Sequence, residues 1–151
     1  MLYVCRRYAT DDNEAEDMVQ EGFIRLFNNL DKFRNTGPFE GWVRCIFVNT
    51  AIKYYHHERQ HNNVQTMEMA TAFESNDAGI LNALSTGELL GLLSELPDGY
   101  RVVFNLYAIE GYSHAEIAKV LDIQESTSRS QLVKARKMLQ TKVIELQRVL
   151  L

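Results

Sequence analysis

The residues with the clearest chemical role lie near the end of the chain, where lysines and arginines recur along one predicted helix. Between residues 129 and 148 the sequence has six of these bases and a single acid, Glu145. Cationic side chains bind DNA phosphates, and the first half of a helix in the major groove contacts base edges. The sequence therefore predicts a DNA-reading surface, with candidate residues Thr127, Arg129, Ser130, Gln131, Lys134 and Arg136.

Capping and turn signals predict the helices that hold this surface. Ser113 and Glu116 have the spacing of a capping box, which opens a short helix, HAEIAKVL. A tight turn, DIQ, leads into a long helix from about residue 125 to residue 150, which is a helix-turn-helix arrangement. Ser130 and Gln131 are expected to lie off the buried stripe of that helix. The stripe itself is predicted to be Leu132, Ala135, Leu139 and Val143.

A second group of charged residues, on an early helix, has the opposite sign. Residues 11–21 contain six acids and no base. The helix is expected to start at Asn13, three residues before Glu16, and to run to about Leu30. Its expected core face is Ala15, Val19, Phe23, Leu26 and Leu30. An isoleucine among carboxylates on the other side favours a partner-binding face, which comprises Asp17, Gln20, Glu21, Ile24 and Phe27.

A third group mixes aromatic and basic side chains. Phe33, Trp42 and two tyrosines lie close in sequence to Arg34, Arg44 and Lys53. Such a mixture suits the stacking of unpaired bases and the tracking of a single strand. Aromatic residues at helical spacing are also common in cores, so the residue types alone leave both interpretations open.

Composition indicates a soluble all-α protein of the cytoplasm. The chain has 151 residues, 46% of them hydrophobic, two prolines, and no apolar run of membrane-spanning length. Cys5 and Cys45 have no framework or metal spacing, which is typical of a reducing compartment. The net charge of −4 argues against a free-standing nucleic-acid binder. We expect two small helical domains, residues 1–60 and 88–151, joined by a flexible linker, residues 61–87.

Further capping and helix-ending residues predict helices on both sides of the linker. Ser85 and Glu88 form another capping box, and Pro97 is expected to end the helix that follows. Gly111 is placed as the C-terminal stop of the next helix. At the start of the chain, MLYVCRRY resembles the end of a helix whose beginning is missing or very short.

The sequence does not indicate an enzyme, a metal site or a cofactor. His57 and His61 are spaced one helical turn apart, with Glu58 between them, but no further ligand is in view. Nucleophile motifs and phosphate-binding glycine loops are absent from the sequence. Two alternatives stay open on the residues: a dimeric helix-turn-helix transcriptional regulator that acts on duplex DNA by itself, and a pure interaction protein such as an adaptor.

Four motifs in order resemble one family. AEDMVQEGFIRLF, then DKFR…G…F.GW…I.VNTA, then LPDGYRVVFNLYAIEGYSHAEIAKVLDI, then SRSQLVKARKML are similar to a bacterial RNA polymerase sigma factor of the extracytoplasmic-function class in the sigma-70 family. The resemblance implies a transcription initiation factor that reads a melted minus-ten element and a duplex minus-thirty-five element. It implies three partners: the core polymerase (its β′ clamp helices and β subunit), promoter DNA and an anti-sigma factor.

The resemblance also assigns roles to residues. The acidic face would dock on the β′ clamp helices, and the loop from Arg34 to Pro38 would capture a flipped base. The implied minus-ten contacts are Phe33, Arg34, Asn35, Thr36, Gly37, Trp42, Asn49 and Lys53. The sequence departs from the family pattern at Asp122, where glycine is usual, and at Ser126 and Ser128, which replace glycine and valine. Ser128 is expected to place a hydroxyl near the core.

Overall fold

The computed structural model describes residues 1–62 and 85–149, and these residues form helices with no strand. The prediction of an all-α protein is therefore confirmed over this part of the chain. The fold divides into an N-terminal unit, Met1–Val64, and a C-terminal unit, Gln65–Leu151. Most of the predicted linker lies outside the described residues. Its two described ends are helical, because α3 continues to Asn62 and α4 begins at Thr86.

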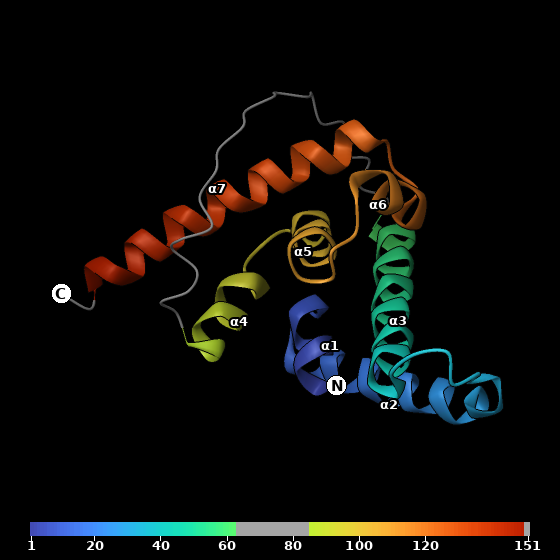
Figure 1. Cartoon of the computed structure of the whole chain (residues 1–151). Coiled ribbons are helices and arrows are strands. Elements are labelled where there is room, and N and C mark those ends of the chain that lie inside the picture. Colours follow the sequence, from blue (N-terminus) through green and yellow to red (C-terminus); the bar gives the residue numbers. More distant parts are fainter. Residues whose placement is uncertain (63–84, 150–151) are drawn as a thin grey trace. The chain divides into compact units, whose positions relative to one another are not determined.

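The N-terminal unit is built from α1 (Leu2–Tyr8), α2 (Asp12–Asn28) and α3 (Phe39–Asn62), with a 3-10 turn at Leu30–Lys32. The short helix α1 packs on both α2 and α3, and α2 crosses and packs against α3 (Figure 1). A side chain from each helix is fully buried at the centre: Cys5, Ala15 and Phe47. Burial raises the pKa of the Cys5 thiol to about 11, so this sulfur stays protonated and packs as an apolar group.

Gly22 determines how closely α2 approaches α3. A Cβ atom at this position would lie 2.5 Å from Cε1 of Phe47 and 2.6 Å from Cδ1. Such distances are far below van der Waals contact, so the aromatic ring occupies the space that a side chain would need. The buried residues of α2 are accordingly Ala15, Met18, Gly22 and Leu26. The predicted core face was wrong at Phe23 and Leu30, which are 42% and 47% exposed.

The start of α2 also differs from the prediction. The N-cap is Asp11, whose carboxylate accepts from the Glu14 backbone N–H at 2.8 Å. Glu14 in turn accepts from the backbone N–H and the hydroxyl of Thr10. The Asp11 carboxylate thus satisfies one of the free N–H donors of the first turn, and the N-cap lies two residues before the expected Asn13.

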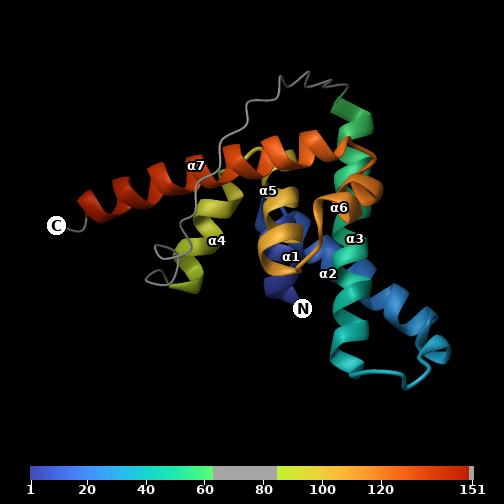
Figure 2. The ribbon, with the colours of Figure 1, turned by 45° about the horizontal axis from the view of Figure 1, so that its top comes forward.

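The C-terminal unit contains α4 (Thr86–Ser94), α5 (Asp98–Phe104), α6 (His114–Leu121) and α7 (Glu125–Val149). A π-helical turn, Asn105–Ile109, continues α5, and Gly111 follows with a φ of 78°. Figure 2 shows α7 as the long element of this unit, against which α4, α5 and α6 pack. The predicted buried stripe is confirmed, because Leu132, Ala135, Leu139 and Val143 are all at most 4% exposed.

Arg101 holds the turn between α4 and α5. Its guanidinium is almost fully buried and donates to the carbonyl of Leu96 at 2.9 Å and to that of Ser94 at 3.3 Å. It also forms an ion pair with Asp98 at 2.6 Å. These bonds satisfy carbonyl groups that are free at the end of α4, where Pro97 prevents the helix from continuing.

Candidate nucleic-acid and partner interfaces

The acidic face of α2 lies at the surface of the N-terminal unit. Ile24 is 56% exposed and Phe27 is 69% exposed, so two large apolar side chains lie among carboxylates. Asp17 and Gln20 are also exposed, and Glu21 is half-buried. The structure thus places all five predicted docking residues on accessible surface of a single helix. Exposed apolar groups beside a strong field of one sign are typical of a protein-binding surface.

Glu21 is the most strongly engaged member of this face. Arg25 Nε donates to its carboxylate at 2.8 Å, and Lys53 Nζ of α3 lies 3.8 Å away. The Arg25 hydrogen bond, above all, holds the pKa of Glu21 below its usual value, so the carboxylate stays charged. On α3, burial and then Asp17 and Glu21 raise the pKa of Tyr54, which shows that the acidic field reaches this neighbouring helix.

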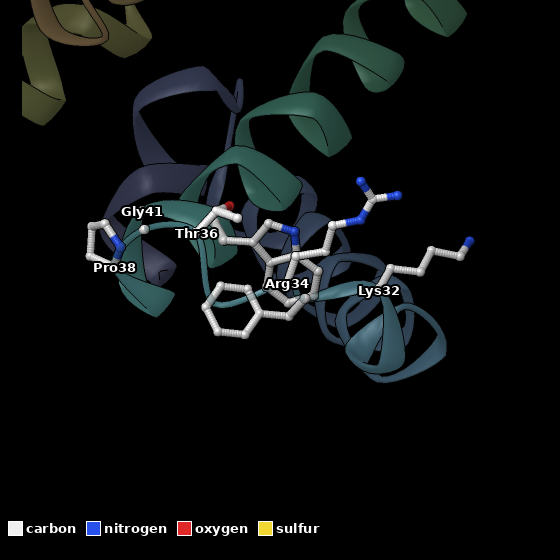
Figure 3. Close-up of a pocket in the computed structure, with 8 residues that line it drawn as sticks. Lys32, Arg34, Thr36, Pro38 and Gly41 are labelled. Carbon is white, nitrogen blue, oxygen red and sulfur yellow. The ribbon is translucent and has the colours of Figure 1, made fainter.

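A pocket of about 370 Å³ lies where the loop after the 3-10 turn meets the start of α3. Five of the predicted minus-ten residues line it, together with Lys32, Pro38 and Gly41. Figure 3 shows Pro38 and Gly41 at one end of the pocket and the Lys32 side chain at the other. The predicted residues in the lining are Phe33, Arg34, Thr36, Gly37 and Trp42.

The two aromatic rings of the pocket lining belong to a cluster of three. The ring centroid of Phe33 lies 5.2 Å from that of Trp42 and 5.2 Å from that of Phe39. Phe33 and Trp42 belong to the pocket lining, whereas Phe39 lies outside it and is 48% exposed. The charged groups in the lining, Lys32 and Arg34, are both cationic. An aromatic wall with cationic side chains suits an unpaired base and its phosphate.

The remaining predicted minus-ten residues lie outside the pocket. Asn35 is exposed and adopts a φ of 52°, a left-handed conformation that asparagine tolerates better than most residues and that turns the loop. Asn49 and Lys53 are exposed one turn apart along α3. The structure therefore does not bring all eight residues to one point, but leaves each accessible on the loop or on α3.

The helix-turn-helix is confirmed in the C-terminal unit. Ser113 and Glu116 form the complete capping box at the start of α6, with the Ser113 backbone N–H donating to Glu116 at 2.8 Å. The turn to α7 passes through Asp122, whose φ of 53° and ψ of 52° are left-handed. This is the conformation that explains why glycine is usual there, and aspartate accepts it at a cost.

Three of the predicted duplex-reading side chains interact with neighbours: one forms an ion pair with an acid, and two lie near tyrosine rings. Arg129 pairs with Glu125 one turn earlier on α7. The Lys134 ammonium lies 5.9 Å from the ring centroid of Tyr100, and the Arg136 guanidinium lies 5.7 Å from that of Tyr107. Arg129 is exposed, while Lys134 and Arg136 are half-buried and carry their charges beside aromatic rings.

Ser130 and Gln131 do not lie off the packed surface, and this part of the prediction was wrong. They are 6% and 7% exposed. The reason is that α5 covers this side of α7: the Gln131 amide lies against Gly99, where an added Cβ would be 3.0 Å from Gln131 Nε2. Ser130 donates its hydroxyl to the Thr127 carbonyl at 3.0 Å. Thr127 itself is half-buried.

Several residues of these surfaces were not found from the sequence. The Ser128 hydroxyl is fully buried, as predicted, but its partner, His114 Nδ1 at 2.9 Å, was not foreseen. Tyr107 stacks on the same histidine. In the N-terminal unit, Lys32 and Gly41 line the pocket. One missed residue, Gly22, could have been found from the sequence. It lies at helical spacing from the other buried residues of α2, and a glycine at such a position indicates a close approach of another helix.

The structure also bears on metal binding and membranes. His57 and His61 lie side by side near the end of α3, with their Nε2 atoms 3.1 Å apart. Within residues 1–62 and 85–149 no three ligating side chains come together as a metal site. Over the same residues, every helix is too short or too polar to cross a bilayer.

Together, these features define a helical protein with an acidic helix face that exposes two apolar side chains, an aromatic pocket and a helix-turn-helix. Comparison with known families agrees. Residues 1–61 match the family model of sigma-70 region 2, and residues 86–139 match that of sigma-70, region 4. The ECF RNA polymerase sigma-E factor of Escherichia coli strain K12 is 31% identical over 141 residues, which cover 86% of this chain and 74% of the relative.

Two further relatives extend this result. The ECF RNA polymerase sigma-E factor of Haemophilus influenzae is 30% identical over 143 residues, covering 87% of this chain and 75% of the relative. Among solved structures, the sigma factor RpoE in complex with the anti-sigma factor NepR from Bartonella quintana matches with a TM-score of 0.57 at 18% identity, over 95% of this chain and 89% of that chain. At this identity the likeness concerns the fold alone.

The chain belongs to the extracytoplasmic-function class of the sigma-70 family of RNA polymerase sigma factors. It is a regulatory initiation factor that binds RNA polymerase and directs it to specific promoters. The alternative of a dimeric regulator that acts without polymerase is not favoured, because region 2 is matched as well as the helix-turn-helix.

Proposed function

We propose that the acidic face of α2 docks on the β′ clamp helices of core polymerase through Asp17, Gln20, Glu21, Ile24 and Phe27. The observation that supports this proposal is the exposure of Ile24 and Phe27 among carboxylates. Burial of the two side chains would supply affinity, and the carboxylates would select a cationic partner. The β subunit, promoter DNA and an anti-sigma factor are the other proposed partners, and the factor works in the cytoplasm with the polymerase.

The test of docking is run-off transcription with purified core polymerase on a library of host upstream regions. Ile24→Glu should abolish the transcripts, because a charge would be buried without a partner. Ile144→Glu is the matched control, since Ile144 is 45% exposed on α7, outside the proposed docking face. Equal transcription by Ile24→Glu and the wild type would refute the docking face.

The pocket at Phe33, Thr36 and Trp42 is proposed to capture one base flipped from the non-template strand of the minus-ten element. Unstacking a base costs a few kcal/mol. Stacking on an aromatic side chain contributes about 1–3 kcal/mol per base, which offsets most of that cost. Strand opening thus draws on binding free energy and requires no catalytic residue of the chain. Asn49 and Lys53 would contact the strand along α3.

Base capture is tested with holoenzyme and two fork-junction probes, one intact and one with an abasic site at the captured position. The wild type should bind the intact probe more tightly. Thr36→Trp, which fills the pocket, should remove the difference between the probes. If the wild type binds both probes equally, the pocket does not capture a base.

The first half of α7 is proposed to read the minus-thirty-five element as duplex through Thr127, Arg129, Lys134 and Arg136. Ser130 and Gln131 are not part of this surface because both are buried. Arg129→Ala should weaken promoter binding and relax the preference for one base pair, whereas Arg148→Ala, an exposed arginine near the other end of α7, should leave that preference intact. If Arg129→Ala keeps the same base-pair preference as Arg148→Ala, the first half of α7 does not read the element.

A further inference from the structure

Tyr107 touches both helices of the helix-turn-helix from outside it. Its ring stacks on His114 of α6, with centroids 4.5 Å apart and planes inclined by 21°. The guanidinium carbon of Arg136 on α7 lies 5.7 Å from the centroid of the same ring. A single side chain from the turn that follows α5 therefore contacts one residue of each helix of the helix-turn-helix.

The backbone around Tyr107 is specialised. Residues Asn105–Ile109 form a π-helical turn, in which the Glu110 N–H donates to the Asn105 carbonyl at 3.0 Å. Such turns are rare and are enriched at functional sites, because the extra residue re-aims the side chains that follow. Tyr107 keeps 36% of its surface exposed, so its ring is not simply part of the core.

His114 links the stack to the start of α7. Its Nδ1 is hydrogen-bonded to the buried Ser128 hydroxyl at 2.9 Å. A buried hydroxyl requires a partner, so this bond fixes the orientation of the ring on which Tyr107 stacks. Burial first, and then the positive charges of Arg129 and Arg136, hold the pKa of His114 below its ordinary value, while Glu125 acts in the opposite direction.

The geometry points to Tyr107 as a positioning residue of the duplex-reading surface: its ring holds Arg136 and His114 in the orientation in which α7 meets DNA. This inference rests on the duplex-reading role proposed for α7. An arginine has many rotamers, and a guanidinium already held over an aromatic face loses less freedom when it binds a phosphate. Removal of the ring should therefore weaken binding through Arg136, although Tyr107 itself makes no DNA contact.

The experiment measures holoenzyme binding to a fluorescent duplex that carries the upstream element of a promoter found by run-off transcription. Tyr107→Leu should bind about two- to fivefold more weakly, which corresponds to one exposed cation–π contact. The slope of log affinity against log salt should fall in magnitude by about one, as for loss of a phosphate contact. Tyr107→Phe keeps the ring and should bind like the wild type.

A double-mutant cycle separates positioning from a general structural effect. In an Arg136→Ala background, Tyr107→Leu should cause little further loss, because the side chain through which it acts is gone. An equal loss in both backgrounds overturns the inference, as does a loss in Tyr107→Phe, which would mean that the hydroxyl itself contacts DNA. Unchanged binding by Tyr107→Leu, while Arg136→Ala weakens it, also overturns the inference and leaves the proposed function standing. If Arg129→Ala and Arg136→Ala both bind normally, the proposed surface itself fails.

Discussion

Replacement of Gly22 by alanine should destabilise the N-terminal unit, although alanine is the better helix former. In the middle of α2, the change to alanine gains about 1 kcal/mol of helix propensity. The new Cβ, however, would lie 2.5–2.6 Å from two atoms of the Phe47 ring, which is fully buried and cannot move into solvent. Overpacking of a buried site costs about 1–3 kcal/mol. With two ring atoms this close, we expect a cost near the upper limit and a net loss of about 2 kcal/mol.

Urea unfolding followed by the fluorescence of Trp42 measures this loss, because Trp42 is the only tryptophan and lies in the N-terminal unit. Gly41→Ala is the matched control in the same unit: its Cβ would meet only Pro38 Cγ, at an ordinary 3.6 Å. The control should unfold at the same or a slightly higher urea concentration than the wild type. A Gly22→Ala variant as stable as the Gly41→Ala variant would refute the argument that Phe47 fixes the approach of α2 to α3.

Arg101→Met should lower the free energy of unfolding of the C-terminal unit by about 2 kcal/mol, because the buried Leu96 carbonyl loses its donor. Urea unfolding followed by circular dichroism measures this loss. An unchanged midpoint would contradict the prediction. Asp122→Gly should raise the free energy of unfolding of the same unit by up to about 1 kcal/mol, since glycine adopts the left-handed φ of 53° without strain. Thermal unfolding measures this gain, and a lower melting temperature than that of the wild type would count against it. The pKa of His114 is held below its ordinary 6.5 in the folded protein, so its contribution to stability is present above pH 6.5 and is lost as pH falls through the folded pKa. Melting temperatures of the wild type and His114→Gln should therefore converge as pH falls below 6.5, and parallel curves would exclude the effect.

The helices and the exposure of their candidate functional faces were largely predictable from the sequence. The capping boxes at Ser85 and Ser113 lie where the spacing of serine and glutamate indicated, because a cap depends on a few neighbouring residues. The same local logic predicted the buried stripe of α7 and the exposure of Ile24. It also anticipated a buried hydroxyl at Ser128.

The predictions that were wrong depended on packing between helices. Ser130 and Gln131 were expected at the surface because helical periodicity describes one helix and does not say how much of it a neighbour covers. In the structure, α5 packs against α7 with Gly99 beside the Gln131 amide, and both Ser130 and Gln131 are buried. Likewise, Phe23 lies on the expected stripe of α2 and packs edge-on against Phe47, with ring centroids 5.2 Å apart, yet it stays 42% exposed because no other helix within residues 1–62 covers the rest of its ring.

The sequence by itself determined the helical class, the helix-turn-helix, the charge of each face and the family, since these follow from local spacing and from the order of motifs. Only the tertiary structure decided which side chains stay accessible and which are held by others. The stack of Tyr107, His114 and Arg136 joins residues from three elements, and the pocket joins Lys32 of the 3-10 turn to Trp42 of α3. Such contacts depend on distances between helices, which are set by the volume of buried side chains such as Phe47 rather than by any local pattern.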